Sequence, residues 1–147
     1  MPTIDPFSSI LSLGQRIRSG ELNAELLTEF YLDRIARLDP TLGAFVEVLS
    51  DRALIQARRA DLELAAGIDR GVLHGTPYAV KDLYDVSGVP TRAGTPILDA
   101  NVPESDAFIV DRLDHLGAVL IGKTHTVQFA YGGVGVNSQL GLSLIHI

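Results

Sequence analysis

Lys81 stands out among the residues whose type and setting could do chemistry. It follows Ala79 and Val80 at the end of a short apolar run within a glycine-rich stretch. Burial at such a position would favour the neutral amine, which a lysine that acts as a general base requires. The alternative interpretation is an exposed lysine at a strand end, without a catalytic role.

A second candidate lysine lies in residues 117–124, whose letters match the phosphate-binding pattern G-x-x-x-x-G-K-[ST]. Its four variable positions are Ala, Val, Leu and Ile, which favour a strand where a phosphate-binding loop would be needed. The preceding residues, 106–116, indicate a helix, whereas that motif follows a strand. We therefore interpret the match as a buried strand and keep a nucleotide-binding module that uses Lys123 as the alternative of another class.

The other titratable residues show no recognisable centre. Asp82 and Asp85 could be paired carboxylates, but we expect solvated loop charges. The sequence has no Cys, which excludes disulfides, thiolate zinc sites and a cysteine nucleophile. The histidines lack the helical spacing of metal ligands, and we interpret all four as ordinary surface or loop residues: His74, His115, His125 and His146.

The elements that must position these residues follow from apolar periodicity and from helix start and stop signals. Four helices are predicted, at residues 8–19, 23–38, 50–66 and 105–116. Three short strands are predicted, at residues 44–49, 78–81 and 118–121. Asn23 should cap the second helix, and Asp39-Pro40 should end it, because the residue before a proline avoids the α region.

The run 118–121 is apolar throughout, which is typical of a strand buried on both faces in a parallel sheet. Helix followed by buried strand, after a helical first third, predicts an α/β fold. The sequence shows no linker, so we expect one domain. We also expect the chain to fold poorly alone, because such a strand needs neighbours on both sides.

Composition and charge exclude several classes of protein. The 147 residues are 46% hydrophobic and 20% charged, which indicates a globular rather than a disordered chain. The formal net charge of −6 argues against a nucleic-acid-binding surface. No apolar run reaches the roughly 18 residues of a membrane helix, and the start does not resemble a secretory signal. We therefore expect a cytoplasmic protein with no membrane or direct nucleic-acid partner.

Several segments, in order, closely resemble the amidase signature family. They begin with Gly-Thr-Pro-Tyr-Ala-Val-Lys-Asp at 75–82 and Gly-Val-Pro-Thr-Arg-Ala-Gly-Thr at 88–95. The later matching segments are Ser105-Asp106-Ala107, Arg112-Leu113, Gly117-Ala118-Val119, Gly122-Lys123-Thr124, Gln128-Phe129-Ala130 and Asn137-Ser138. The order and spacing hold from about residue 8 to Gly141, and the ordered set is highly specific.

The resemblance implies an amide hydrolase, or an amide-group transferase, with a Ser-Ser-Lys triad on a mixed β-sheet covered by helices. Lys81 matches the family lysine, which in its neutral form takes a proton from a bridging serine as that serine takes one from the nucleophile. Backbone N–H groups then stabilise the oxyanion. Tyr131, Gly132 and Gly133 match a substrate-side loop, for which a purely structural turn is the alternative. The resemblance implies no metal and no cofactor.

Two departures limit what this sequence can do alone. Both family serines lie in a later Gly-Gly-Ser-Ser-Gly-Gly-Ser-like segment, and none of the serines after Lys81 has that setting: Ser87, Ser105, Ser138 and Ser143. No Asp, Glu, Lys or Arg follows Lys123, and the resemblance stops at Gly141. We expect residues 1–141 to be the N-terminal part of a single amidase domain, inactive by itself. Residues 142–147 are expected to be an adaptor-derived, non-native tail, with a genuine divergent C-terminus as the alternative.

The expected activity of the parent protein is hydrolysis of a carboxamide C–N bond in a small molecule. The alternative is release of ammonia from glutamine by an amidotransferase subunit that serves glutamyl-tRNA. The resemblance leaves a homodimer or an amidotransferase complex open for the whole protein. A third hypothesis is a non-catalytic domain that keeps the fold for assembly.

Overall fold

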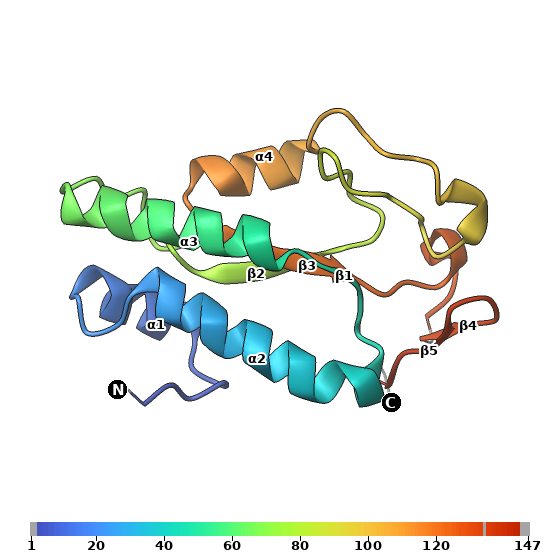
Figure 1. The fold of residues 1–147 in the computed structure, drawn as a ribbon, viewed down its shortest axis with the longest axis horizontal. Coiled ribbons are helices and arrows are strands. Elements are labelled where there is room, and N and C mark those ends of the chain that lie inside the picture. The colour runs from blue at the N-terminus through green and yellow to red at the C-terminus, as the bar shows by residue number, and fades with distance from the viewer. Residues whose placement is uncertain (1–2, 134, 145–147) are drawn as a thin grey trace. The chain divides into compact units, whose positions relative to one another are not determined.

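The computed structural model describes residues 3–133 and 135–144 (Figure 1). The chain divides into two compact units. The first holds the residues up to Ile35, Leu49–Tyr78 and Arg112–Ile121, and the second holds Ala36–Val48, Ala79–Asp111 and the residues from Gly122 on. None of the helices in the described part of the chain is long and apolar enough to cross a membrane.

The first unit is built on α1 (Ile10–Arg18), the greater part of α2 (Ala24–Leu42) and α3 (Ser50–Ala65). Its core cluster is made by buried aliphatic side chains of α1, of α2 and of the turn between them: Leu13, Ile17, Leu22 and Leu27. The Asn23 side chain accepts a hydrogen bond from the N–H of Leu26 at 2.7 Å, which confirms the predicted helix cap.

The end of α2 differs from the prediction, because the helix continues through Pro40 to Leu42. A proline in the last turn forfeits only one backbone hydrogen bond, so its cost is smaller there than in a helix interior. The Asp39 carboxylate accepts the N–H groups of Ala44 and Phe45, at 2.7 and 3.2 Å. These bonds fix the turn from the helix into the following strand.

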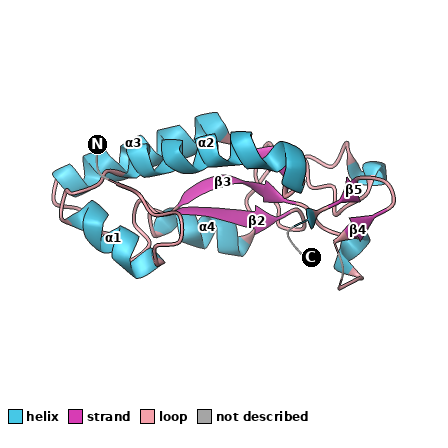
Figure 2. Cartoon of the chain, turned by 90° about the horizontal axis from the view of Figure 1, so that it is seen from below, coloured by secondary structure: helices cyan, strands magenta, loops and turns pink. Residues whose placement is uncertain are grey.

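A three-stranded sheet contains β1 (Phe45–Val48), β2 (Pro77–Lys81) and β3 (Val119–Thr124), in the order β1-β3-β2. β1 is antiparallel to β3, with Phe45 opposite Thr124. β2 and β3 run in the same direction (Figure 2). Bonds join Val119 N–H to the Thr76 carbonyl, and Asp82 N–H to the Thr124 carbonyl. The sheet is therefore mixed, which confirms the predicted α/β class with a mixed sheet.

The predicted buried strand is confirmed as β3, whose residues 119–123 are all buried. It extends to Thr124, further than the predicted 118–121. One of its neighbours is antiparallel, so the apolar run does not mark a purely parallel sheet. Both neighbours come from this chain, which removes the reason given for expecting poor folding.

The remaining elements are short. η1 (Pro96–Leu98) lies in the glycine-rich stretch, and α4 (Phe108–His115) begins later than the predicted residue 105. After β3 come η2 (Gln128–Ala130) and the antiparallel pair β4 (Val136–Asn137) and β5 (Gly141–Leu142). The segment from β3 to β5 supplies most of the candidate site.

Candidate functional site

Lys81 is the last residue of β2, and its side chain is exposed. Its position is that of the alternative interpretation, an exposed lysine at a strand end, and the burial that would favour a neutral amine is not present. Successive strand residues point to opposite faces, and in β2 it is Val80 that enters the core. The Lys81 amine therefore faces solvent at a strand end, where another group can reach it.

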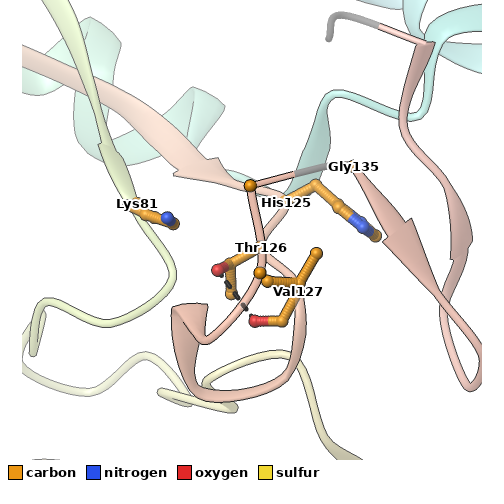
Figure 3. Close-up of a pocket in the computed structure, with 7 residues that line it drawn as sticks. Lys81, His125, Thr126, Val127 and Gly135 are labelled. Carbon is orange, nitrogen blue, oxygen red and sulfur yellow. Dashed lines mark hydrogen bonds between the residues drawn. The ribbon is translucent and has the colours of Figure 1, made fainter.

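A small pocket of about 50 Å³ adjoins Lys81 in the second unit (Figure 3). Its other lining residues come from the two segments after β3: His125, Thr126, Val127, Gly132, Gly133 and Gly135. Two of the predicted substrate-binding residues, Gly132 and Gly133, thus line the same pocket as Lys81. Neither glycine has a side chain to fill the space, so backbone is available to a bound group.

Tyr131, the third predicted substrate-binding residue, lies elsewhere. It is 98% exposed and does not line the Lys81 pocket. It borders a second hollow of about 460 Å³, lined also by Gln128, Phe129, Val136, Asn137 and Ser138. Val127 and Gly132 line both hollows, so the two share part of their walls.

The segment between these hollows holds an unusual backbone conformation. Phe129 and Ala130 have φ angles of 50° and 54°, in the left-handed region that non-glycine residues rarely adopt. Two consecutive residues of this kind persist only where the surroundings determine them, and such sites are concentrated around function. The observation supports a binding role for the Gln128–Gly133 loop over a purely structural turn.

The buried side chain of Asn137 holds the chain segments around this loop together. Its Nδ2 donates to the carbonyls of Gly94 and Thr126, at 2.7 and 3.1 Å. Its Oδ1 accepts the N–H groups of Gln139 and Leu140, at 2.9 and 3.1 Å. This buried amide fixes the residues that follow β3 against the Gly94 turn and so maintains the wall of the pocket.

Lys123 does not occupy a phosphate-binding loop. It lies within β3, its side chain is fully buried, and its Nζ lies 2.8 Å from Asp82 Oδ1. Asp82 is fully buried as well, so the expectation of a solvated loop charge is wrong for this residue. Asp85 is half-buried and does not share the Lys123 contact. The burial of Asp82 follows from the opposite charge of Lys123, which no local sequence pattern reveals.

Two of the histidines, His74 and His125, lie in turn or loop segments, as expected, but both are buried rather than at the surface. His74 lies in the first unit, where its Nδ1 accepts the N–H of Arg70 and its Nε2 lies 3.1 Å from the Glu63 carboxylate. Burial lowers the pKa of His74, against the opposing effect of Glu63. His115 is exposed, as expected, and His146 lies outside the described residues.

Within residues 3–133 and 135–144, no three His, Cys, Asp or Glu side chains are gathered so that they could hold a metal ion. Four pocket residues are not predicted from the sequence as part of a site: His125, Thr126, Val127 and Gly135. The signal that points to the first two is their place directly after a central strand, because ligands bind beyond the carboxyl ends of strands in α/β sheets.

Comparison with known proteins identifies a protein family that matches most of this chain. A model of the amidase family, described as "Amidase", matches residues 26–143. A glutamyl-tRNA(Gln) amidotransferase subunit from Acidothermus cellulolyticus is 41% identical over 131 residues, which is 89% of this chain and 26% of that protein. The corresponding protein from Thermosynechococcus vestitus is 39% identical over 136 residues, or 92% of this chain and 28% of the relative.

Solved structures show the same likeness. The native peptide amidase from Stenotrophomonas maltophilia superposes with a TM-score of 0.86 and 36% identity, covering 94% of this chain and 30% of that one. Fatty acid amide hydrolase gives a TM-score of 0.85 and 26% identity, covering 92% of this chain and 24% of its own. The 147-residue chain therefore spans less than a third of the length of each of these relatives.

Proposed function

Because the chain belongs to the amidase family, we propose that it forms part of an enzyme that breaks carboxamide C–N bonds, with Lys81 as the final proton acceptor. One observation carries the proposal: Lys81, Gly132 and Gly133, identified separately in the sequence, line one pocket. A solvent-accessible amine beside a backbone without side chains can meet both a proton donor and a substrate.

In the proposed reaction, neutral Lys81 takes a proton from a bridging serine while that serine takes one from the nucleophilic serine. The nucleophile then attacks the amide carbonyl, and the leaving amine departs with a proton. Water releases the acyl group in a second step. Neither serine of this proposal is among the residues of the chain, so we propose that the 147 residues alone do not hydrolyse amides.

Because Lys81 is in the chain and the two proposed serines are not, the chain would hold only part of the active site. Residues 1–141 would be the N-terminal part of a single amidase domain, and residues 142–147 a non-native tail, although the family match runs to residue 143 and Leu142 pairs with Val136. Residues 145–147 of that tail lie outside the described residues. Reading the gene beyond codon 141 tests both statements, because a serine- and glycine-rich segment should follow in the parent sequence.

A second candidate activity is release of ammonia from glutamine within a tRNA-dependent amidotransferase. Relatives named as glutamyl-tRNA(Gln) amidotransferase subunits are 37–42% identical to the chain. A stand-alone amidase and an amidotransferase subunit differ in partners: the first acts alone or as a homodimer on a small-molecule amide, whereas the second acts in a complex. The cytoplasmic location expected from the sequence stays a prediction.

The test is ammonia release by the purified full-length gene product. A stand-alone amidase should release ammonia from simple carboxamides without added protein. An amidotransferase subunit should use glutamine and should need its partner subunits for full rate. No ammonia from either substrate, with a folded protein and partners present, would contradict the proposal and favour a non-catalytic role in assembly.

A further inference from the structure

We propose that Asp82 and Lys123 form a buried ion pair that positions Lys81 and keeps the charge at the end of β2 balanced. This role rests on the proposed function of Lys81. The two groups lie fully buried next to the strand end that carries Lys81, and the proposed proton transfer uses neither of them.

The ammonium group of Lys123 lies close to three oxygen atoms. Its Nζ donates to the Pro90 carbonyl at 2.8 Å and to Thr91 Oγ1 at 2.7 Å. The third contact, at 2.8 Å, is to Asp82 Oδ1. Two hydrogen bonds and one ion pair therefore hold the cation in place.

Asp82 is held equally firmly, by side chain and backbone. Its Oδ2 accepts the N–H of Arg92 at 3.2 Å. Its backbone N–H donates to the Thr124 carbonyl, and its carbonyl accepts the N–H of Ala93, both at 3.0 Å. Since Asp82 directly follows Lys81, these bonds also fix the backbone from which the Lys81 side chain extends.

Stability alone does not account for the pair. A buried ion pair costs desolvation, and well-packed apolar residues of similar size are often as stable or more so. While it stays intact, the pair adds no net charge at the end of β2, where Asp82 follows Lys81 in the sequence. Loss of the Lys123 charge would leave the Asp82 carboxylate uncompensated in a poorly screened site, and its attraction would hold a proton on the Lys81 amine.

The sequence makes a direct test possible, because Lys81 and Lys123 are its only lysines. Trace acetylation of the 147-residue chain with acetic anhydride should therefore modify Lys81 and the N-terminal amine but spare buried Lys123. Peptide mass spectrometry then gives the pH midpoint of Lys81 modification in each variant. Circular dichroism first establishes that each variant is folded.

Lys123→Met should raise the midpoint of Lys81 modification by about one pH unit. Lys123→Arg keeps the positive charge, so its midpoint of Lys81 modification should lie within about 0.2 pH unit of the wild-type midpoint. The double variant Asp82→Asn/Lys123→Met removes the uncompensated carboxylate and should restore the wild-type midpoint, although its packing is more disturbed than that of the single variant. If Lys123→Met does not fold, Lys123→Gln takes its place, because it keeps a donor toward the Pro90 carbonyl.

A purely structural role predicts a different result: the double variant would be at least as altered as the single one. An unchanged midpoint in the folded single variant, or the same shift in the double variant, would overturn the proposal. Acetylation of Lys81 can be measured whether or not the protein hydrolyses amides. The experiment therefore tests the role of the ion pair independently of the proposed activity. A midpoint that behaves as expected in a protein without amidase activity would refute only the latter.

Discussion

At the scale of single residues, Gly94 allows its chain segment to approach Thr126 and Val127, two residues that line the Lys81 pocket. Its φ is +73°, and a Cβ there would lie 2.7–2.8 Å from backbone atoms of Thr126 and Val127. Glycine is thus needed at this position both for its backbone conformation and for the space. The wall of the Lys81 pocket depends on this contact.

Gly94→Ala should destabilise the protein by about 2–4 kcal/mol, the sum of left-handed backbone strain and overpacking. Gly88→Ala is the matched control, because Gly88 has a φ of +74° with nothing within 4 Å of an added Cβ. The control should lose only about 1 kcal/mol. Urea denaturation of both variants measures the difference, and equal losses would show that the close approach does not matter.

Asn137 carries the second residue-scale prediction. Asn137→Asp keeps the acceptor oxygen but places a carboxylate oxygen against the carbonyls of Gly94 and Thr126, which lose their donor. We expect a loss of about 3 kcal/mol and faster proteolysis after β3. Asn101→Asp, at an exposed residue whose side chain donates to the Thr91 carbonyl, should cost less than about 1 kcal/mol. Comparable losses in both variants would contradict the role given to Asn137.

At the scale of elements, a side chain of α3 caps the N-terminus of α2. The Asp61 carboxylate accepts the N–H groups of Ala24 and Glu25, at 2.7 and 3.0 Å. These are orphan donors of the first turn, which a helix cannot satisfy internally. Asn23 supplies the local cap, and Asp61 supplies a second one from a distant part of the sequence.

Asp61→Ala should therefore lower the free energy of unfolding by about 1–2 kcal/mol. Asp51 is the control: it is an exposed acid in the first turn of α3, so Asp51→Ala should cost less than about 1 kcal/mol. Thermal unfolding of the two variants provides the comparison. Equal melting temperatures would argue against capping of α2 by α3.

At the scale of the whole molecule, acid should weaken the fold through the first unit. Burial lowers the pKa of His74, and a hydrogen bond from Arg70 lowers the pKa of Glu63. A group whose pKa is lower in the folded state binds fewer protons there than in the unfolded chain, so stability rises with pH. The His74 contribution is complete above its ordinary value of 6.5 and is lost as the pH falls toward its folded pKa.

The free energy of unfolding should therefore fall between about pH 7 and pH 5, and His74→Gln should flatten that dependence. His115→Gln, at an exposed histidine, should leave the slope of the wild-type protein unchanged. Glu63, Asp69 and Arg70 face His74 and stay in place in both variants. A wild-type slope in the His74→Gln protein would contradict this assignment.

How much can be predicted from the sequence depends on how far apart the deciding residues lie. The helices and the strands follow from neighbouring residues, whereas the role proposed for Lys81 comes from the resemblance to a family. The end of α2 is an exception among local signals, because the helix continues through Pro40 to Leu42. The burial of Asp82 and His74 depends on partners supplied by other segments, Lys123 for Asp82 and Glu63 for His74, so local patterns do not reveal it.

The central claim is that Lys81 accepts the proton in amide hydrolysis, and the most direct measurement is kcat/KM of the full-length gene product for a carboxamide. Lys81→Ala should lower it by about 10²- to 10⁴-fold. Lys81→Arg should lower it as much, because a guanidinium stays protonated and cannot accept a proton. Hydrolysis by Lys81→Ala at the wild-type rate would contradict the claim.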